Sequence, residues 1–210
     1  MTALVNFTQK KIWNVVGALV CWFAVFGQLV LIIINRQTDL FETVIRFFSY
    51  FTILTNTLVA LYFTSQISTI RALKFLKNNA SLTAITGFIL IVGFVYQFVL
   101  RSIWQPSGFQ MVIDELLHTI IPMYVLVYWF VFITFNDLKP RLLFSWLLYP
   151  LVYFIVIMFR GSFSDFYPYP FVDATSIGYT KVFGNFLVLS VVVIVLLGIL
   201  YQLARFFKKQ

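Results

Sequence analysis

Charge is the scarcest property of this sequence. Only 10% of its 210 residues are Asp, Glu, Lys or Arg, whereas about a quarter of a soluble globular domain is charged. Hydrophobic residues make up 61%, and the mean hydropathy is +0.95. A chain with so few charged groups cannot cover a water-facing surface, so the composition excludes a soluble domain and predicts a membrane protein.

Residues that bind metals or form disulfides are equally sparse. The sequence has one cysteine, Cys21, one histidine, His118, and nine glycines that do not cluster. A single cysteine excludes a disulfide within the chain. One histidine and one intramembrane cysteine cannot supply the usual ligands of zinc or haem, and scattered glycines form no phosphate-binding loop. We therefore predict no metal and no cofactor.

Long apolar stretches are what the sequence does contain. Six of them carry no Asp, Glu, Lys or Arg, and a helix that crosses a hydrocarbon core needs roughly 20 such residues. They lack the alternation of barrel strands, and backbone groups in lipid must be satisfied within the segment, which favours helices. The sequence predicts an all-α polytopic membrane protein, a six-transmembrane-helix bundle forming a single integral membrane domain of residues 1–210. Its predicted helices lie near residues 12–35, 43–66, 79–102, 111–135, 141–160 and 177–205.

Basic residues are concentrated in every second segment outside the predicted helices. The two termini and the second and fourth connections hold ten basic residues and one acidic residue, Asp137, whereas the other connections hold five basic and six acidic residues. Short cytoplasmic loops collect Lys and Arg, so the pattern predicts cytoplasmic N- and C-termini in a multi-pass protein of the cell membrane. We attribute the net charge of +8 to topology and to attraction for anionic membrane lipids, with no nucleic-acid partner. The ten basic residues are Lys10, Lys11, Arg71, Lys74, Lys77, Lys139, Arg141, Arg205, Lys208 and Lys209.

The second predicted helix carries an unexpected polar stripe. Ser49, Thr52 and Asn56 are three and four residues apart, so they share one face of a continuous helix, with Arg46 and Thr55 close beside it. At about 1.5 Å per residue, Thr52 lies about 10 Å below the outer surface. Polar groups inside a membrane are costly and often functional, which makes this stripe a candidate site.

The fourth predicted helix carries the second polar group. His118 follows Asp114 and Glu115 by four and three residues, so a carboxylate one turn away can orient its ring. The expected depth of His118 matches that of Thr52. In the third predicted helix, Gln97 and Arg101 are also four residues apart near the outer end.

A hydroxyl beside a neutral imidazole, with a carboxylate to orient the base, is a minimal activated nucleophile. Thr52 would attack an acyl carbon, and His118 would take the proton and return it to the leaving group. Asn56 or Arg101 could stabilise the oxyanion. The alternative remains open that these hydroxyls bond to their own helix and that the polar groups only hold helices together.

Three short segments occur in a familiar order. Phe51–Asn56 lies in the second predicted helix, His118–Pro122 in the fourth, and Tyr169–Phe171 precedes the sixth. With these segments the chain resembles a prokaryotic six-helix membrane protein family (the Pr-six-Pr type) and, more remotely, the androgen-induced membrane hydrolases of animals. The resemblance spans essentially the whole chain in helix order. Those animal proteins are threonine hydrolases that cleave fatty acid esters of hydroxy fatty acids.

This resemblance implies a hydrolase whose nucleophilic threonine falls on Thr52 and whose histidine falls on His118. Thr55 is a competing position for the nucleophile. The sequence departs from the animal pattern at Asn56, and the adjacent acids Asp114 and Glu115 are its own feature. The implied partners are membrane lipids and a lipid-like small-molecule substrate.

Two other functions fit the same residues. In a small transporter or a lipid- or ligand-binding membrane protein, the charged residues would bind an anion or relay protons. In a scaffold, they would only lock helix packing. The charged residues concerned are Arg46, Arg101, Asp114, Glu115 and His118. The segment 161–173, with two prolines among its aromatics, suits either a lid in the headgroup zone or an ordinary interfacial aromatic belt. No feature of the sequence indicates an oligomeric state.

Overall fold

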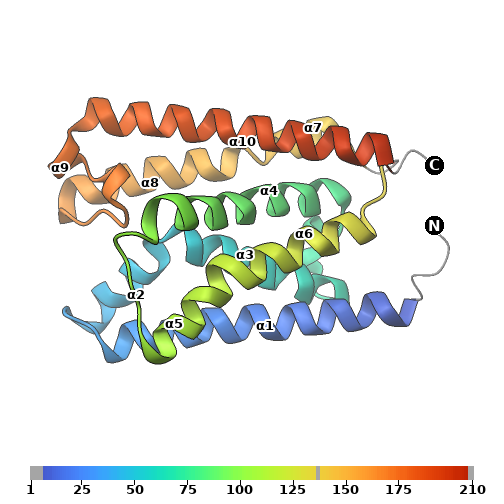
Figure 1. Ribbon diagram of the computed structural model, residues 1–210, viewed down its shortest axis with the longest axis horizontal. Helices are drawn as coiled ribbons and strands as arrows, with labels where there is room; N and C mark the ends of the chain where they lie inside the picture. Colours follow the sequence, from blue (N-terminus) through green and yellow to red (C-terminus); the bar gives the residue numbers. More distant parts are fainter. Residues whose placement is uncertain (1–6, 136–137, 208–210) are drawn as a thin grey trace.

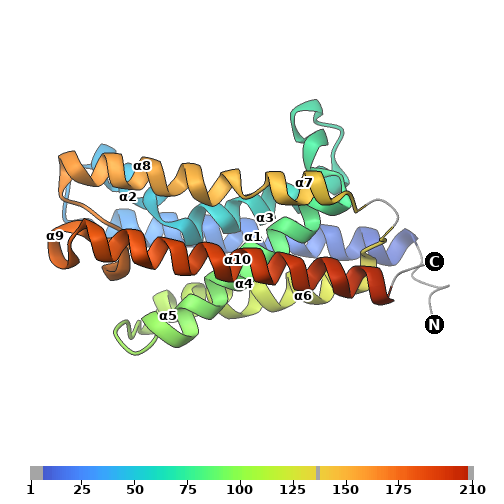
Figure 2. The ribbon, with the colours of Figure 1, turned by 90° about the horizontal axis from the view of Figure 1, so that it is seen from above.

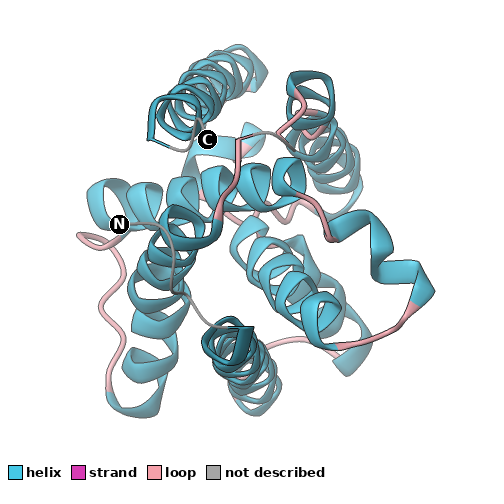
Figure 3. Ribbon diagram, turned by 90° about the vertical axis from the view of Figure 1, so that its right-hand side faces the viewer, coloured by secondary structure: helices cyan, strands magenta, loops and turns pink. Residues whose placement is uncertain are grey.

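The computed structural model describes residues 7–135 and 138–207, in which helices are the only regular secondary structure (Figures 1 and 3). Five helical segments are long and apolar enough to cross a membrane, and a bent pair of helices would make a sixth. The predicted all-α membrane fold is therefore confirmed. Asp137, Lys208 and Lys209, which belong to the predicted charge pattern, lie outside the described residues.

The five segments agree closely with the predicted spans. They are α1 (Phe7–Ile34), α4 with the π-helical turn η2 (Asn79–Val95 and Tyr96–Leu100), α5, the π-helical turn η3 and α6 (Gly108–Glu115, Leu116–Ile120 and Ile121–Phe132), α7 and α8 (Pro140–Ser145 and Leu148–Ser164), and α10 (Tyr179–Phe207). The bent pair is α2 (Leu40–Ser49) and α3 (Phe51–Ile67), and shorter pieces are the 3₁₀ turns η1 (Arg71–Leu76) and η4 (Pro170–Val172) and the helix α9 (Ala174–Ile177).

The first and last helices, α1 and α10, define the two ends of the bundle. α1 begins and α10 ends at the same end, which we call the terminal end, while α2, α9 and the start of α5 lie at the opposite, far end (Figures 1 and 2).

Helix α4 is the central element. Within its most apolar window, 67% of the residues are buried, compared with 17% for α7–α8 and for α10. It packs against α3, α6, α7 and α10. The outer helices expose large aliphatic side chains such as Leu187, Val188 and Val191 of α10. Such a surface is unstable in water and stable in lipid, where only internal packing and hydrogen bonds must be satisfied.

Helix α1 packs most extensively against α3, and a glycine permits the close approach. A Cβ atom added to Gly17 would lie 2.7 Å from the ring of Phe63, which is fully buried. We expect Gly17→Ala to destabilise the fold by about 1–3 kcal/mol, because an overpacked core must shift its side chains. The thermal unfolding midpoint of the purified protein measures this effect. Gly198→Ala is the matched control, since nothing lies within 4 Å of that added atom; equal midpoints for both variants would contradict the predicted packing.

The predicted second helix is broken. α2 and α3 meet at an angle of 76°, because Tyr50 between them is extended, with φ −81° and ψ 123°. Two tyrosines from distant segments satisfy the backbone groups released by the break. The hydroxyl of Tyr153 donates to the carbonyl oxygen of Ser49 at 2.9 Å, and the amide of Thr52 donates to the hydroxyl of Tyr169 at 3.1 Å. The expectation of one continuous helix over residues 43–66 was therefore wrong at Tyr50.

Candidate active site

A cavity of about 650 Å³ at the far end contains both predicted catalytic side chains. It lies between the end of α1, the start of α3, the turns η2 and η3, and the segment that precedes η4. Its polar lining consists of Thr52, His118, Asp114, three tyrosines and several uncharged amides and hydroxyls. These are Gln28, Asn35, Tyr50, Tyr96, Gln105, Ser107, Gln110 and Tyr169, and no Lys or Arg from the described part of the chain lines the cavity.

The helix break presents Thr52 to this cavity. Thr52 lies in the first turn of α3, where backbone amides have no partner within the helix. Tyr169 supplies one, and its hydroxyl also lies 3.3 Å from Thr52 Oγ1. Only 8% of Thr52 is exposed. Its hydroxyl is therefore held in place at a cavity wall by contact with a second hydroxyl.

A widened turn of helix presents His118. The π-helical turn η3 contains it, and such turns are common at functional sites because they turn a side chain out of the regular spacing. A second π-helical turn, η2, begins with Tyr96, whose ring stacks on the imidazole with centroids 4.1 Å apart. At Gly93 of α4 an added Cβ would lie 3.1 Å from the backbone oxygen of His118, so this glycine allows α4 to approach η3 closely.

The contacts of His118 determine its tautomer. Nδ1 lies 2.9 Å from the backbone oxygen of Asp114, which can only accept a hydrogen bond, so Nδ1 carries the proton. In the neutral ring, Nε2 then holds the lone pair, and Nε2 makes no hydrogen bond to any described residue. Nε2 is thus the ring nitrogen that a general base would use.

Asp114 lies behind the imidazole. Its Oδ1 is 3.5 Å from His118 Nδ1, and its side chain is only 7% exposed. Within the described chain, Oδ2 has no hydrogen-bond partner. A carboxylate beside Nδ1 can orient the imidazole ring. The predicted pairing of this acid with the histidine is present in the structure.

A second, apolar cavity meets the first at Thr52. It has a volume of about 100 Å³, and it shares Thr52, Leu100 and Tyr169 with the larger cavity. The other residues that line it are almost all apolar: Phe51, Ile91, Val92, Val95, Pro150, Tyr153, Phe154, Phe171, Val172, Phe186, Leu189, Ser190 and Val193. Thr52 and Tyr169 therefore stand between a cavity of mixed polar and apolar lining and one that is almost wholly apolar.

The other residues of the predicted stripe on the second helix do not join the site. Ser49 lies before the break, where its hydroxyl donates to Ile45 and its side chain lines a different cavity. Asn56 is fully buried, and its amide donates to the carbonyl oxygens of Thr52 and Leu117 at 2.9 and 3.3 Å. The proposed oxyanion role of Asn56 is therefore unsupported, because its donors are already engaged. The helix break at Tyr50 separates Ser49 from Thr52 and Asn56, which remain four residues apart in α3.

Thr55 competes poorly with Thr52 as the nucleophile. It is fully buried, and its hydroxyl contacts that of Tyr149 at 3.1 Å. It lines neither of the two cavities that meet at Thr52.

The second proposed oxyanion donor, Arg101, is also engaged elsewhere. Its guanidinium donates to Gln97 and to Glu115, at 2.8 and 2.5 Å. Glu115 accepts a further hydrogen bond from Thr119, so it is turned away from His118. The structure therefore separates the adjacent acids: Asp114 belongs to the site, whereas Glu115 belongs to an ion pair with Arg101.

Arg46 belongs to a separate charged cluster with Glu42 and Arg160. It forms a salt bridge of 2.7 Å with Glu42, which also accepts from Arg160 at 2.6 Å, and both guanidiniums lie against the ring of Phe166. This cluster ties α2 to α8 and to the segment that follows α8. Arg46 does not line the Thr52 cavity, so it is not part of the candidate site.

The sequence pattern predicts no chemistry for Tyr169. Its segment contributes only to the family resemblance and to the candidate lid. Because the Thr52 amide donates to its oxygen, its own proton is free to be donated toward Thr52 Oγ1 or toward a bound ligand. Burial raises the pKa of Tyr169 to about 12, so the hydroxyl keeps this proton at neutral pH.

Thr52 and His118 face one cavity, but the hydrogen bonds of the described residues do not include a direct one between them. Any proton transfer between them therefore requires a movement of the side chains or bridging water.

Comparisons with protein-family models, curated proteins and solved structures found no match to this chain.

Proposed function

We propose that this chain is an integral membrane hydrolase of lipid esters, with Thr52 as the nucleophile and His118 as the general base. The observation that carries the proposal is the single cavity that Thr52, His118 and Asp114 share. The finer topology belongs to the same proposal. The bent pair α2–α3 counts as a sixth span, the termini are cytoplasmic, and the site lies in the outer half of the cell membrane.

In the proposed reaction, His118 Nε2 takes the proton of the Thr52 hydroxyl while Oγ1 bonds to the ester carbonyl carbon. The ester C–O bond then breaks, and the same proton passes from Nε2 to the departing alcohol. Water repeats the sequence on the acyl-threonine, which releases the acid and restores Thr52. Asp114 stabilises the imidazolium that exists between the two proton transfers.

Tyr169 is the group best placed to stabilise the oxyanion. Its hydroxyl is 3.3 Å from Thr52 Oγ1, the atom to which the carbonyl carbon would bond, and it retains a proton to donate. It takes the role that the sequence suggested for Asn56 or Arg101.

The lining of the two cavities supports a neutral substrate. The small apolar cavity beyond Thr52 suits an acyl chain, and the larger one offers amides and hydroxyls without a cation among the described residues. A phosphate or free carboxylate buried there would have no opposite charge, which is costly. We therefore expect a neutral ester such as an acylglycerol to be preferred over an ester with an anionic head.

An activity-based probe tests the proposal directly. A fluorophosphonate, which reacts with activated hydroxyls, should label the detergent-purified protein. Labelling should be lost in Thr52→Ala and retained in Thr55→Ala. Substrate flux across vesicles with no dependence on Thr52 would instead favour the transporter hypothesis.

Tyr169→Phe tests the proposed stabilisation of the oxyanion. We expect it to lower kcat for a neutral lipid ester by about 10²-fold, the effect of removing one oxyanion donor. The same change removes the partner of the Thr52 amide, so the unfolding free energy should fall by about 1–3 kcal/mol. Tyr201→Phe is the control, because Tyr201 of α10 lines neither cavity. A kcat for Tyr169→Phe equal to that of Tyr201→Phe would remove Tyr169 from the mechanism.

A further inference from the structure

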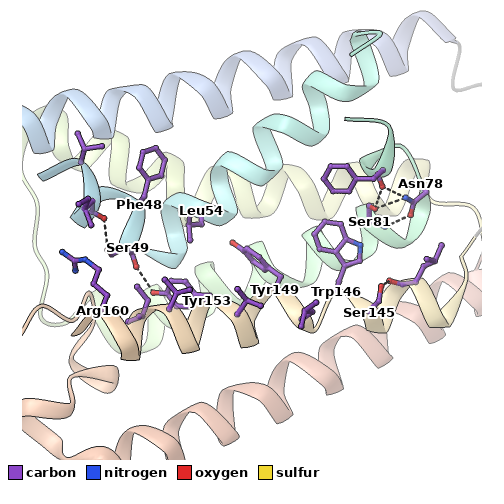
Figure 4. Close-up of a pocket in the computed structure, with 18 residues that line it drawn as sticks. Phe48, Ser49, Leu54, Asn78, Ser81, Ser145, Trp146, Tyr149, Tyr153 and Arg160 are labelled. Carbon is purple, nitrogen blue, oxygen red and sulfur yellow. Dashed lines mark hydrogen bonds between the residues drawn. The ribbon is translucent and has the colours of Figure 1, made fainter. Parts of the chain in front are cut away.

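A groove larger than either of the two cavities that meet at Thr52 lies beside the helix break. It has a volume of about 880 Å³ and runs between α2–α3 and α7–α8, with η1 and the start of α4 at the terminal end (Figure 4). Its lining is Val44, Ile45, Phe48, Ser49, Leu54, Phe75, Asn78, Ser81, Leu142, Ser145, Trp146, Leu148, Tyr149, Val152, Tyr153, Val156, Ile157 and Arg160. Thr52 and His118 do not line it, and Tyr153 is the one lining residue that it shares with the small apolar cavity, so the groove goes beyond the proposed activity.

The groove has the length and chemistry of a site for a lipid chain. Its floor on α7–α8 extends from Leu142 to Arg160, which is about 27 Å of helix, close to the thickness of roughly 30 Å of a hydrocarbon core. The hydroxyls of Tyr149 and Tyr153 turn away toward α2–α3, where they bond Thr55 and the backbone of Ser49. Their rings therefore leave the middle of the groove apolar.

The far end of the groove is positively charged. Arg160 lines it, and only one acid, Glu42, is shared between Arg160 and Arg46. The Glu42 contact uses Nη2 of Arg160, whereas Nη1 makes no hydrogen bond to any described residue. Two guanidiniums against one carboxylate leave one positive charge uncompensated in this cluster. An anion at this end would compensate that charge and accept from the guanidinium.

We propose that the groove binds one anionic phospholipid of the surrounding bilayer, with an acyl chain along α8 and the phosphate at Arg160. The apolar walls supply the attraction for the chain, which any phospholipid shares. Arg160 supplies the selectivity for a net negative headgroup, because a zwitterionic lipid brings its own cation to the same place.

Native mass spectrometry of the detergent-purified protein tests the proposal. Phosphatidylglycerol and phosphatidylcholine with identical tails are titrated in turn, and we expect one phosphatidylglycerol to be retained more tightly. Arg160→Gln should weaken its binding about fivefold, the size expected for one basic residue at a membrane surface. Lys181→Gln removes an equal charge from exposed α10 outside the groove and should change nothing.

A second variant covers the case in which Arg160→Gln does not fold. Val156 lines the groove and is 53% exposed, so Val156→Trp places an indole in the path of the acyl chain while the ion pairs of Arg160 remain. It should weaken binding of the retained lipid. Equal affinity of the wild type for the two lipids would overturn the proposal, as would unchanged phosphatidylglycerol binding in Val156→Trp. Equally tight binding of glycerol phosphate, which lacks tails, would overturn it as well.

Discussion

Replacing Thr52 with alanine is expected to lower kcat for a neutral lipid ester by at least about 10³-fold, because the acyl-enzyme can no longer form. Folding should change little. The backbone amide of residue 52 keeps its hydrogen bond to Tyr169, and this bond, not the side chain, satisfies the start of α3. The measurements are ester hydrolysis by the detergent-purified variant, its labelling by a fluorophosphonate, and its thermal unfolding midpoint.

Two further variants serve as controls for Thr52→Ala. Thr55→Ala removes a buried hydroxyl from the same helix and breaks its contact with Tyr149, so it should lower stability while labelling persists. Thr52→Ser retains the hydroxyl at the cavity wall and should retain measurable hydrolysis. Labelling of Thr52→Ala at the wild-type level would show that Thr52 is not the nucleophile and would remove the hydrolase proposal.

Composition and length were sufficient to predict the membrane fold. A helix that crosses lipid must satisfy its own backbone and present apolar side chains all round, so each span is visible as a local run of residues. The break at Tyr50 is different in kind. Its exposed backbone groups are satisfied by Tyr153 and Tyr169, which lie 104 and 117 residues from their partners. No local pattern could predict that partnership.

In the candidate site, too, contacts within one helix could be predicted from the sequence, whereas contacts between helices could not. The contact of Asp114 with His118 spans one helical turn, and the spacing predicted that one of the two acids, Asp114 or Glu115, would hold the ring. The roles suggested for Asn56 and Arg101 depended on which groups they would meet from other helices. Asn56 meets the carbonyl of Leu117, Arg101 meets the carboxylate of Glu115, and neither residue lines the Thr52 cavity. Long-range hydrogen bonding, rather than residue type, decided these roles.

His118→Gln is expected to lower kcat by about 10²–10⁴-fold, the usual contribution of a general base. Asp114→Asn should cost less, about 10²-fold, because only the stabilisation of the imidazolium is lost. In a Ser–His–Asp enzyme the same substitution costs about 10⁴-fold, since it reverses the tautomer. Here the tautomer is set by the backbone oxygen of Asp114, 2.9 Å from Nδ1, which the substitution does not remove.

The ranking of these two variants tests the geometry of the site more sharply than either variant alone. The ranking is obtained by measuring steady-state hydrolysis of one neutral ester by His118→Gln and by Asp114→Asn. Glu115→Gln is the control, because that carboxylate faces Arg101 and Thr119 and should leave kcat unchanged. If Asp114→Asn loses as much activity as His118→Gln, the carboxylate and not the main chain must hold the proton on Nδ1. The ring would then have to turn toward Oδ1, now 3.5 Å away, before Thr52 could be activated.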